Sequence, residues 1–213
     1  ITQRNLELTS NLQGTQENTL ADIFDQTATS MGSRLWRRWL TRPLRDHKIL
    51  HERQNAIEDL LSSQTTDEIY KLLRNIGDIE RILARVALKS ARPRDLVQLR
   101  FALSLLPELH NIVSQNTSVK IKELRKKCTE IPDLLDLLQR SIVENPPVII
   151  RDGGVIAFGY NEELDELRNL SKNADQFLID LEIQEKERTG IATLKVGYNR
   201  IHGYYIETSR TQA

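Results

Sequence analysis

Basic and amide side chains gather near the end of the sequence, where they could hold a nucleic-acid backbone. Such groups donate hydrogen bonds to phosphate oxygens without reading bases. Three tyrosines are interleaved with them, Tyr198, Tyr204 and Tyr205. The spacing leaves a second interpretation equally open, an ordinary strand pair with packed tyrosines and a few surface charges. The donors are Lys195, Asn199, Arg200, His202 and Arg210.

A second basic row occurs earlier, at close to helical spacing. Guanidinium groups suit phosphate geometry, so this row could also contact a polyanion. No exposed aromatic or amide pattern accompanies it, and we favour a solvated or ion-pairing face. The row of Arg81, Arg85 and Lys89 is interpreted as a solvent face in the same way. The members of the earlier row are Arg34, Arg37, Arg38, Arg42 and Arg45.

Two further groups could in principle do chemistry. His47 and His51 stand four residues apart near Glu52, as metal ligands on one helix face can, but no third ligand follows at a recognisable spacing. We favour surface histidines. Cys128 follows two lysines that could lower its thiol pKa, although an unreactive helical cysteine is favoured. Because it is the only cysteine, it indicates a reducing compartment, and we expect a cytoplasmic protein.

The sequence contains none of the common nucleotide-binding or nucleophile motifs. It has no G-x-x-x-x-G-K-[ST], G-x-G-x-x-G, C-x-x-C or G-x-S-x-G. We therefore expect no enzymatic activity from this chain and assign it no catalytic, cofactor-binding or metal-binding residue. The 30 basic and 30 acidic side chains balance, so an electrostatic partner must be met by a local patch. No apolar run approaches the ~20 residues of a membrane span.

The periodicity of apolar residues indicates which elements position the terminal donors. Apolar side chains recur at three- and four-residue steps from Leu164 to Leu181, which predicts one long helix over about 161–187. At about 1.5 Å per residue it would be roughly 40 Å long, and we expect it to protrude. From residue 193 to 209 an alternating pattern predicts a β-hairpin. A lone hairpin is marginal in water, so we expect the domain to continue beyond Ala213.

The preceding residues predict a helical base. Low aromatic content and abundant Leu, Arg, Glu and Gln are typical of a largely helical protein. The apolar sides of short helices must bury one another in an irregular core. Residues 4–8 look extended. Two apolar runs flank Asp152-Gly153, which predicts a second hairpin over 148–157.

These elements predict a mainly α fold with an irregular helical core, a small β-hairpin junction, a long protruding helix and a partial antiparallel β structure after it. We expect three parts along the chain. The first is the helical core at 1–160, the second is the long helix at 161–191, and the third is the hairpin at 192–213.

Several motifs, taken in order along the chain, resemble the MutS family of DNA mismatch repair proteins. Trp36 departs from this pattern, since the family more often has a smaller aliphatic residue there. The motifs are Arg4–Leu8, Asn18–Ala21, Met31–Leu35, Arg38–Leu40, Arg42–Leu44, Val148–Arg168, Glu187–Ile191, Leu194–Gly197 and His202–Ile206.

The resemblance implies the core, or lever, region of that family and the outgoing half of a clamp that crosses DNA. It implies mismatched double-stranded DNA, a second copy of the protein and a MutL-like protein as partners. ATP and Mg²⁺ would belong to an ATPase domain outside this sequence, as would the domain that reads mismatches. The DNA-backbone contacts carried over are Lys195, Asn199, Arg200 and His202.

Three alternatives stay open at this stage. One is a structural helical module without DNA contact. Another is a related branch of the family that is not devoted to mismatch repair. The third is a metal-dependent enzyme built on His47 and His51.

Overall fold

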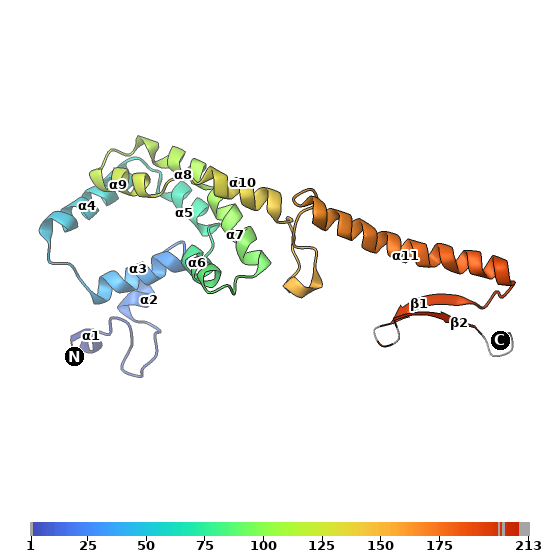
Figure 1. Cartoon of the computed structure of the whole chain (residues 1–213). Coiled ribbons are helices and arrows are strands. Elements are labelled where there is room, and N and C mark those ends of the chain that lie inside the picture. Colours follow the sequence, from blue (N-terminus) through green and yellow to red (C-terminus); the bar gives the residue numbers. More distant parts are fainter. Residues whose placement is uncertain (1, 200, 202, 209–213) are drawn as a thin grey trace. The chain divides into compact units, whose positions relative to one another are not determined.

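A computed structural model describes residues 2–199, 201 and 203–208, and it confirms a mainly α fold with one small antiparallel sheet (Figure 1). Two compact units make up the chain, Ile1–Ala157 and Phe158–Ala213. The junction between them lies close to the predicted boundary at residue 160. The further boundary at residue 191, which falls inside the second unit, stays a prediction.

The first unit consists of short helices joined by tight connections. Side chains cap several of them: Thr19 Oγ1 accepts from the N–H of Asp22 at 3.3 Å, and Asp46 Oδ1 accepts from that of Lys48 at 2.9 Å. The helices are α1 (Thr2–Asn5), α2 (Leu20–Phe24), α3 (Ser30–Thr41), α4 (His47–Ser62), α5 (Thr66–Arg74), α6 (Ile79–Ala87), α7 (Pro93–Ser104), α8 (Leu106–Ile112), α9 (Val119–Lys127) and α10 (Pro132–Ser141), with 3-10 turns η1 (Val113–Gln115) and η2 (Ile150–Asp152).

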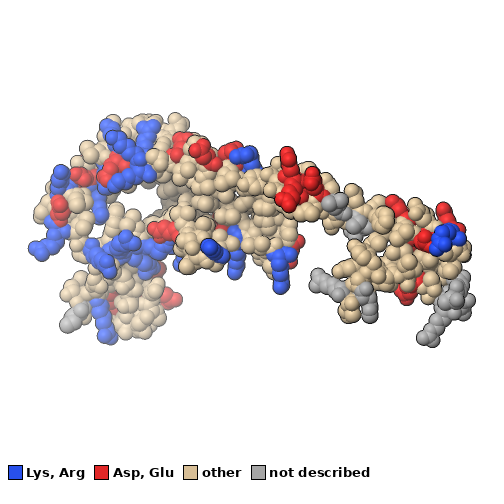
Figure 2. All heavy atoms as spheres, viewed as in Figure 1, with Lys and Arg blue, Asp and Glu red and all other residues tan. Residues whose placement is uncertain are grey.

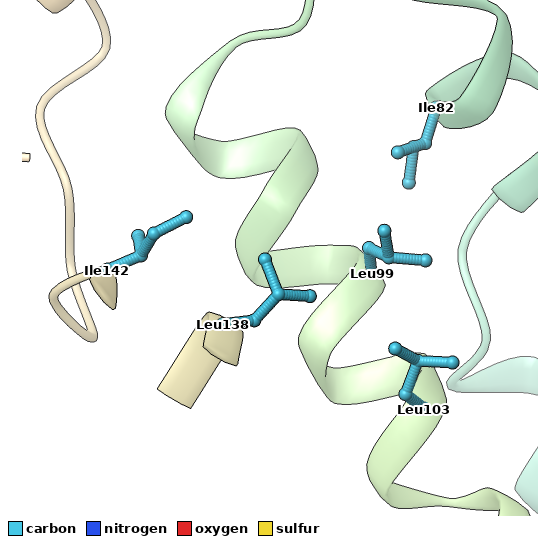
Figure 3. Close-up of a cluster of buried hydrophobic side chains, with 5 residues drawn as sticks. All are labelled: Ile82, Leu99, Leu103, Leu138 and Ile142. Atoms are coloured by element: carbon cyan, nitrogen blue, oxygen red, sulfur yellow. The ribbon is translucent and has the colours of Figure 1, made fainter. Parts of the chain in front are cut away.

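The core of this unit is built around α7. Leu99 and Leu103 of α7 lie in one buried cluster that also includes side chains from α6 and α10 (Figure 3). Ala102 belongs to a second cluster, with Leu72 of α5 and Ile76. Because α7 contributes to both clusters, it joins the helices on its two sides into one core. The members of the first cluster are Ile82, Leu99, Leu103, Leu138 and Ile142.

Polar contacts also hold the helices of this unit together, including α4 and α9, which contribute no residue to these two clusters. Asp59 Oδ2 in α4 accepts hydrogen bonds from the backbone N–H groups of Thr117 and Ser118, at 2.9 and 2.8 Å, where α9 begins. Those bonds lower the pKa of Asp59, with the Ser118 N–H as the largest cause. Arg100 Nη1 donates to the carbonyl of Ile142 at 2.7 Å and so caps the end of α10.

Two local predictions for this unit are wrong. The extended segment at residues 4–8 begins inside helix α1 instead. The hairpin predicted over 148–157 is absent, since its first run leads into η2 and its second run pairs with the residues at the end of α10. There the N–H of Val143 donates to Val155 O at 3.1 Å, and that of Ala157 to Ser141 O at 2.9 Å. Val155 packs against the first core cluster, so burial draws the second run away from the first.

The second unit is the long helix α11 (Glu162–Thr189) followed by strands β1 (Lys195–Asn199) and β2 (Gly203–Glu207), as predicted. Asn161 Oδ1 caps the helix by accepting from the N–H of Leu164 at 2.8 Å. Gly190 ends it with φ of 70°, a left-handed conformation that costs glycine little. With 28 residues at about 1.5 Å each, the helix is about 42 Å long. No helix among the described residues has the length and apolarity needed to span a membrane.

Candidate nucleic-acid interface

Two of the predicted donors, Lys195 and Asn199, lie on a hairpin whose register is defined over both strands. Lys195 pairs with Glu207, Val196 with Ile206, Gly197 with Tyr205, Tyr198 with Tyr204, and Asn199 with Gly203. Successive side chains of a strand point to opposite faces. Lys195 and Asn199 therefore share one face of the hairpin, while Val196 and Tyr198 share the other.

Helix α11 holds the first strand. The backbone N–H of Val196 donates to Glu182 Oε2 at 3.0 Å, and the other carboxylate oxygen of Glu182 pairs with Lys186 Nζ at 2.6 Å. These contacts lower the pKa of Glu182, and Lys186 is the largest cause. Leu194, just before the strand, is buried. The hairpin is thus attached to α11 by a charge-assisted hydrogen bond and by apolar packing.

The tyrosines pack on the hairpin itself. The rings of Tyr198 and Tyr204 lie 5.0 Å apart at an interplanar angle of 55°, a tilted cross-strand pair. Tyr205 crosses over Gly197, where an added Cβ would lie 2.9 Å from both Cζ and Oη of the tyrosine. A side chain at position 197 would displace this ring. Packing of the tyrosines agrees with the strand-pair interpretation, although Tyr198 and Tyr204 remain exposed to solvent.

The structure describes two of the four DNA-contact residues carried over from the resemblance. Lys195 is exposed, and it pairs with Glu207 in the register, so the two side chains lie on the same face of the hairpin. Asn199 is half-buried at the start of the turn, and its Oδ1 accepts from the N–H of Ile201 at 3.0 Å. Arg200 and His202, as well as Arg210, lie outside the described residues.

An apolar groove between α11 and the hairpin is a feature that sequence reasoning missed. It has a volume of about 500 Å³, and Phe177 and Ile206 on its walls are 65% and 60% exposed. The helical stripe of the sequence includes Phe177, Leu178 and Leu181, but periodicity along one helix does not indicate that the hairpin forms a groove with this stripe. The lining residues are Phe177, Leu178, Leu181, Val196, Tyr204, Tyr205 and Ile206.

The arginine row of α3 has a mixed outcome. Both terminal nitrogens of Arg34 donate to the carboxylate of Asp78, each at 2.7 Å, and Nη2 also donates to Glu80 Oε2 at 2.6 Å. This confirms ion pairing for Arg34. Figure 2 shows basic side chains gathered over α3, and Arg38 in α3 and Arg42 and Arg45 just after it are exposed. The pKa of Asp78 is lowered, chiefly by its hydrogen bonds with Arg34.

In the next basic row, the solvent-face interpretation is wrong for Arg85. Its Nη2 donates to Oδ1 of the buried Asp95 at 2.7 Å, which ties α6 to the start of α7. Arg81 remains exposed and pairs with Asp78 at 3.4 Å. Lys89 is also exposed.

The remaining candidates for chemistry receive little support. His47 and His51 are exposed on α4, and nowhere in the described part of the chain do three or more potential metal ligands come together. Burial raises the pKa of the Cys128 thiol, which is opposite to the lowering that neighbouring lysines could cause. An unreactive cysteine therefore agrees with the structure.

A comparison with protein families adds one finding. A family model described as MutS domain III matches residues 1–194. The matched segment covers the helical first unit and all of α11, and it ends immediately before β1.

Proposed function

The chain belongs to the MutS family, and on this premise we propose that it forms the helical core and lever of a mismatch repair protein, with a hairpin that contacts DNA. One observation carries the proposal, namely that the exposed strand bearing Lys195 is bonded directly to the long helix through Glu182 and Val196. A load on the hairpin is therefore applied to α11.

The contacts that we propose are to the phosphate backbone and not to bases. Lys195 and Asn199 lie four residues apart on one strand face, a separation of about 13 Å at 3.3 Å per residue. Arg200 and His202, which follow Asn199 within three residues of the sequence, would supply further donors. Glu207, opposite Lys195, would compete with a phosphate for the lysine, so we expect modest affinity from this contact.

The proposed role of α11 is to carry a mechanical constraint. DNA held by the hairpin would restrict its motion, and the helix would transmit that restriction as a nearly rigid element. Side-chain pairs one turn apart support such stiffness, with Gln176 Nε2 donating to Asp180 at 2.9 Å and Lys186 pairing with Glu182. In the helical unit, α7 would receive little distortion because it is buried in two clusters.

The other partners belong to the complete protein that we propose. They are mismatched double-stranded DNA, a second copy of the protein and a MutL-like protein. ATP and Mg²⁺ would act on a separate ATPase domain, because this sequence contains no phosphate-binding loop to hold them. We assign this chain no catalytic role.

Salt-dependent binding of a DNA duplex tests the contact. A phosphate contact releases counterions, so log affinity falls as log salt concentration rises. When Lys195→Ala removes one phosphate contact, this slope should become less steep by about 0.9. Lys71→Ala is the matched control, since Lys71 is an exposed lysine on α5 in the other unit. An unchanged slope in Lys195→Ala would favour a helical module without DNA contact. The pairing of Lys195 with Glu207 in the register also agrees with that alternative.

The lever role needs a separate experiment in the complete protein. Inserting Gly-Gly near Asn173 interrupts α11 while leaving the hairpin and its donors in place. We expect DNA binding to persist and stimulation of ATP hydrolysis by DNA to be lost. Coupling that survives the insertion would refute the lever while leaving the DNA contact intact.

A further inference from the structure

A second groove, in the helical unit, combines positive charge with exposed aliphatic side chains. It lies between the connection from α6 to α7 and the segment that leads into η2, and its volume is about 460 Å³. We refer to it as the basic groove. Its lining residues are Lys89, Ser90, Ala91, Arg92, Val148, Ile149, Ile150 and Arg151.

The charge of the basic groove is uncompensated. Lys89, Arg92 and Arg151 are all exposed, and within the described ranges none of the three side chains forms an ion pair, while no acidic residue lines the groove. Of the two nearest acids in sequence, Asp95 is bonded to Arg85 and to the N–H of Arg92. Asp152 follows Arg151 in the sequence and is exposed. A ligand with carboxylates would supply the missing partners.

The other side of the groove is aliphatic. Val148, Ile149 and Ile150 are consecutive, and they are 53%, 45% and 62% exposed. Apolar side chains grouped in this way on a surface are typical of an interaction site. A phosphate backbone gains nothing from them, whereas apolar side chains of a protein would bury them.

Hydrogen bonds preform the backbone on both sides. At the end of α6, the N–H of Lys89 donates to Val86 O at 3.0 Å and that of Ser90 to Arg85 O at 2.8 Å. Across the groove, the N–H of Asp152 donates to Ile149 O at 3.2 Å. A ligand therefore meets surfaces that are already ordered, which lowers the entropic cost of binding.

We propose that the basic groove binds a protein segment in which acidic and apolar side chains are interleaved. The carboxylates of the segment pair with the three cations, and its apolar side chains cover Val148, Ile149 and Ile150. This surface lies in the helical unit, so the proposal does not depend on the DNA contact proposed for the hairpin.

Fluorescence anisotropy of the 213-residue chain tests this, with a fluorescein-labelled peptide of interleaved leucine and glutamate as the probe. The triple variant Lys89→Gln, Arg92→Gln, Arg151→Gln should bind the peptide about tenfold more weakly, because three exposed charge pairs are lost. The matched control Arg38→Gln, Arg42→Gln, Arg45→Gln removes the same charge from exposed positions in α3 and in the connection that follows it, and it should bind as the unaltered chain does. Thermal unfolding of each variant verifies that it is folded.

Two further measurements test whether apolar contacts contribute to peptide binding in addition to charge. Ile149→Ser should weaken binding of the peptide without changing binding of a labelled DNA duplex. A second peptide, with serine in place of leucine, should bind more weakly than the first. Equal affinity in the two triple variants would overturn the proposal. The proposal would also be overturned if the groove variant lost affinity for the DNA duplex, the control variant did not, and neither lost affinity for the peptide. The groove would then bind nucleic acid.

Discussion

The backbone N–H of Val196 in β1 donates to Glu182 Oε2 in α11 at 3.0 Å, so a carboxylate of the helix bonds directly to the backbone of the hairpin. The same carboxylate pairs with Lys186, which holds it in position on the helix surface. The strand is therefore placed by residues that lie one turn apart on α11, a few residues before the helix ends.

Replacing Glu182 should loosen the hairpin without unfolding the helical unit. In Glu182→Ala the N–H of Val196 loses its acceptor, and we expect its exchange with solvent to become faster by on the order of tenfold. Amide hydrogen exchange followed by NMR measures this directly. Glu185→Ala is the control, because Glu185 pairs with Arg188 within the helix. Equal exchange at Val196 in both variants would show that packing alone holds the strand.

Acid should weaken the attachment between α4 and α9. The pKa of Asp59 is lowered in the folded chain, so its contribution to stability is present above the ordinary aspartate pKa of about 3.9 and is lost as the pH falls through the folded value. Asp59→Asn keeps one acceptor but does not titrate. The melting temperature of the variant should lie below that of the unaltered chain near neutral pH, and the gap should close below about pH 4. A gap that is constant with pH would contradict this assignment.

Gly197 is required by the ring of Tyr205. In Gly197→Ala the new Cβ would lie 2.9 Å from Cζ and Oη of that ring, so the tyrosine must move. We expect the hairpin to lose about 1–3 kcal/mol of local stability, measured from the exchange of its amide protons. Combining Gly197→Ala with Tyr205→Ala removes the clash, and the double variant should be less destabilised than the sum of the single ones. Strict additivity would mean that the ring adapts without cost.

Leu99 should be a principal determinant of the stability of the helical unit. It is 6% exposed and lies in the cluster between α6, α7 and α10, so Leu99→Ala should cost about 2–5 kcal/mol in the free energy of unfolding. Leu88→Ala removes the same atoms from a side chain that is 77% exposed and should stay within about 0.5 kcal/mol. Denaturant unfolding monitored by circular dichroism measures both. Similar losses in the two variants would argue against the core described above.

Most helices could be predicted because their signals are local. The apolar stripe from Leu164 to Leu181, the cap at Asn161 and the glycine at 190 together determine where α11 begins and ends. The alternation after residue 193 likewise predicts β1 and β2. At the candidate interface, residue type and strand alternation were enough to place Lys195 and Asn199 together on one hairpin.

The failures occur where distant residues compete. Two apolar runs around Asp152-Gly153 favour a hairpin by themselves, yet Val155 gains more by packing on the core, and Val143 and Ser141 supply the backbone partners. The spacing of its row predicts that Arg85 faces solvent, but in the fold Arg85 is hydrogen-bonded to Asp95 of the next helix. Neither outcome follows from spacing along one segment, because each depends on which other segment is brought within contact distance.

By itself, the sequence determined the helices, the terminal hairpin and the motifs that resemble the MutS family, because each depends on neighbouring residues. Only the tertiary structure decided that Glu182 holds the strand and that Arg34 forms an ion pair with Asp78. It also decided that Lys89, Arg92 and Arg151 line one groove. These relationships join residues far apart in the chain or on different elements. Their free energies arise from burial and charge pairing that exist only once the helices have packed.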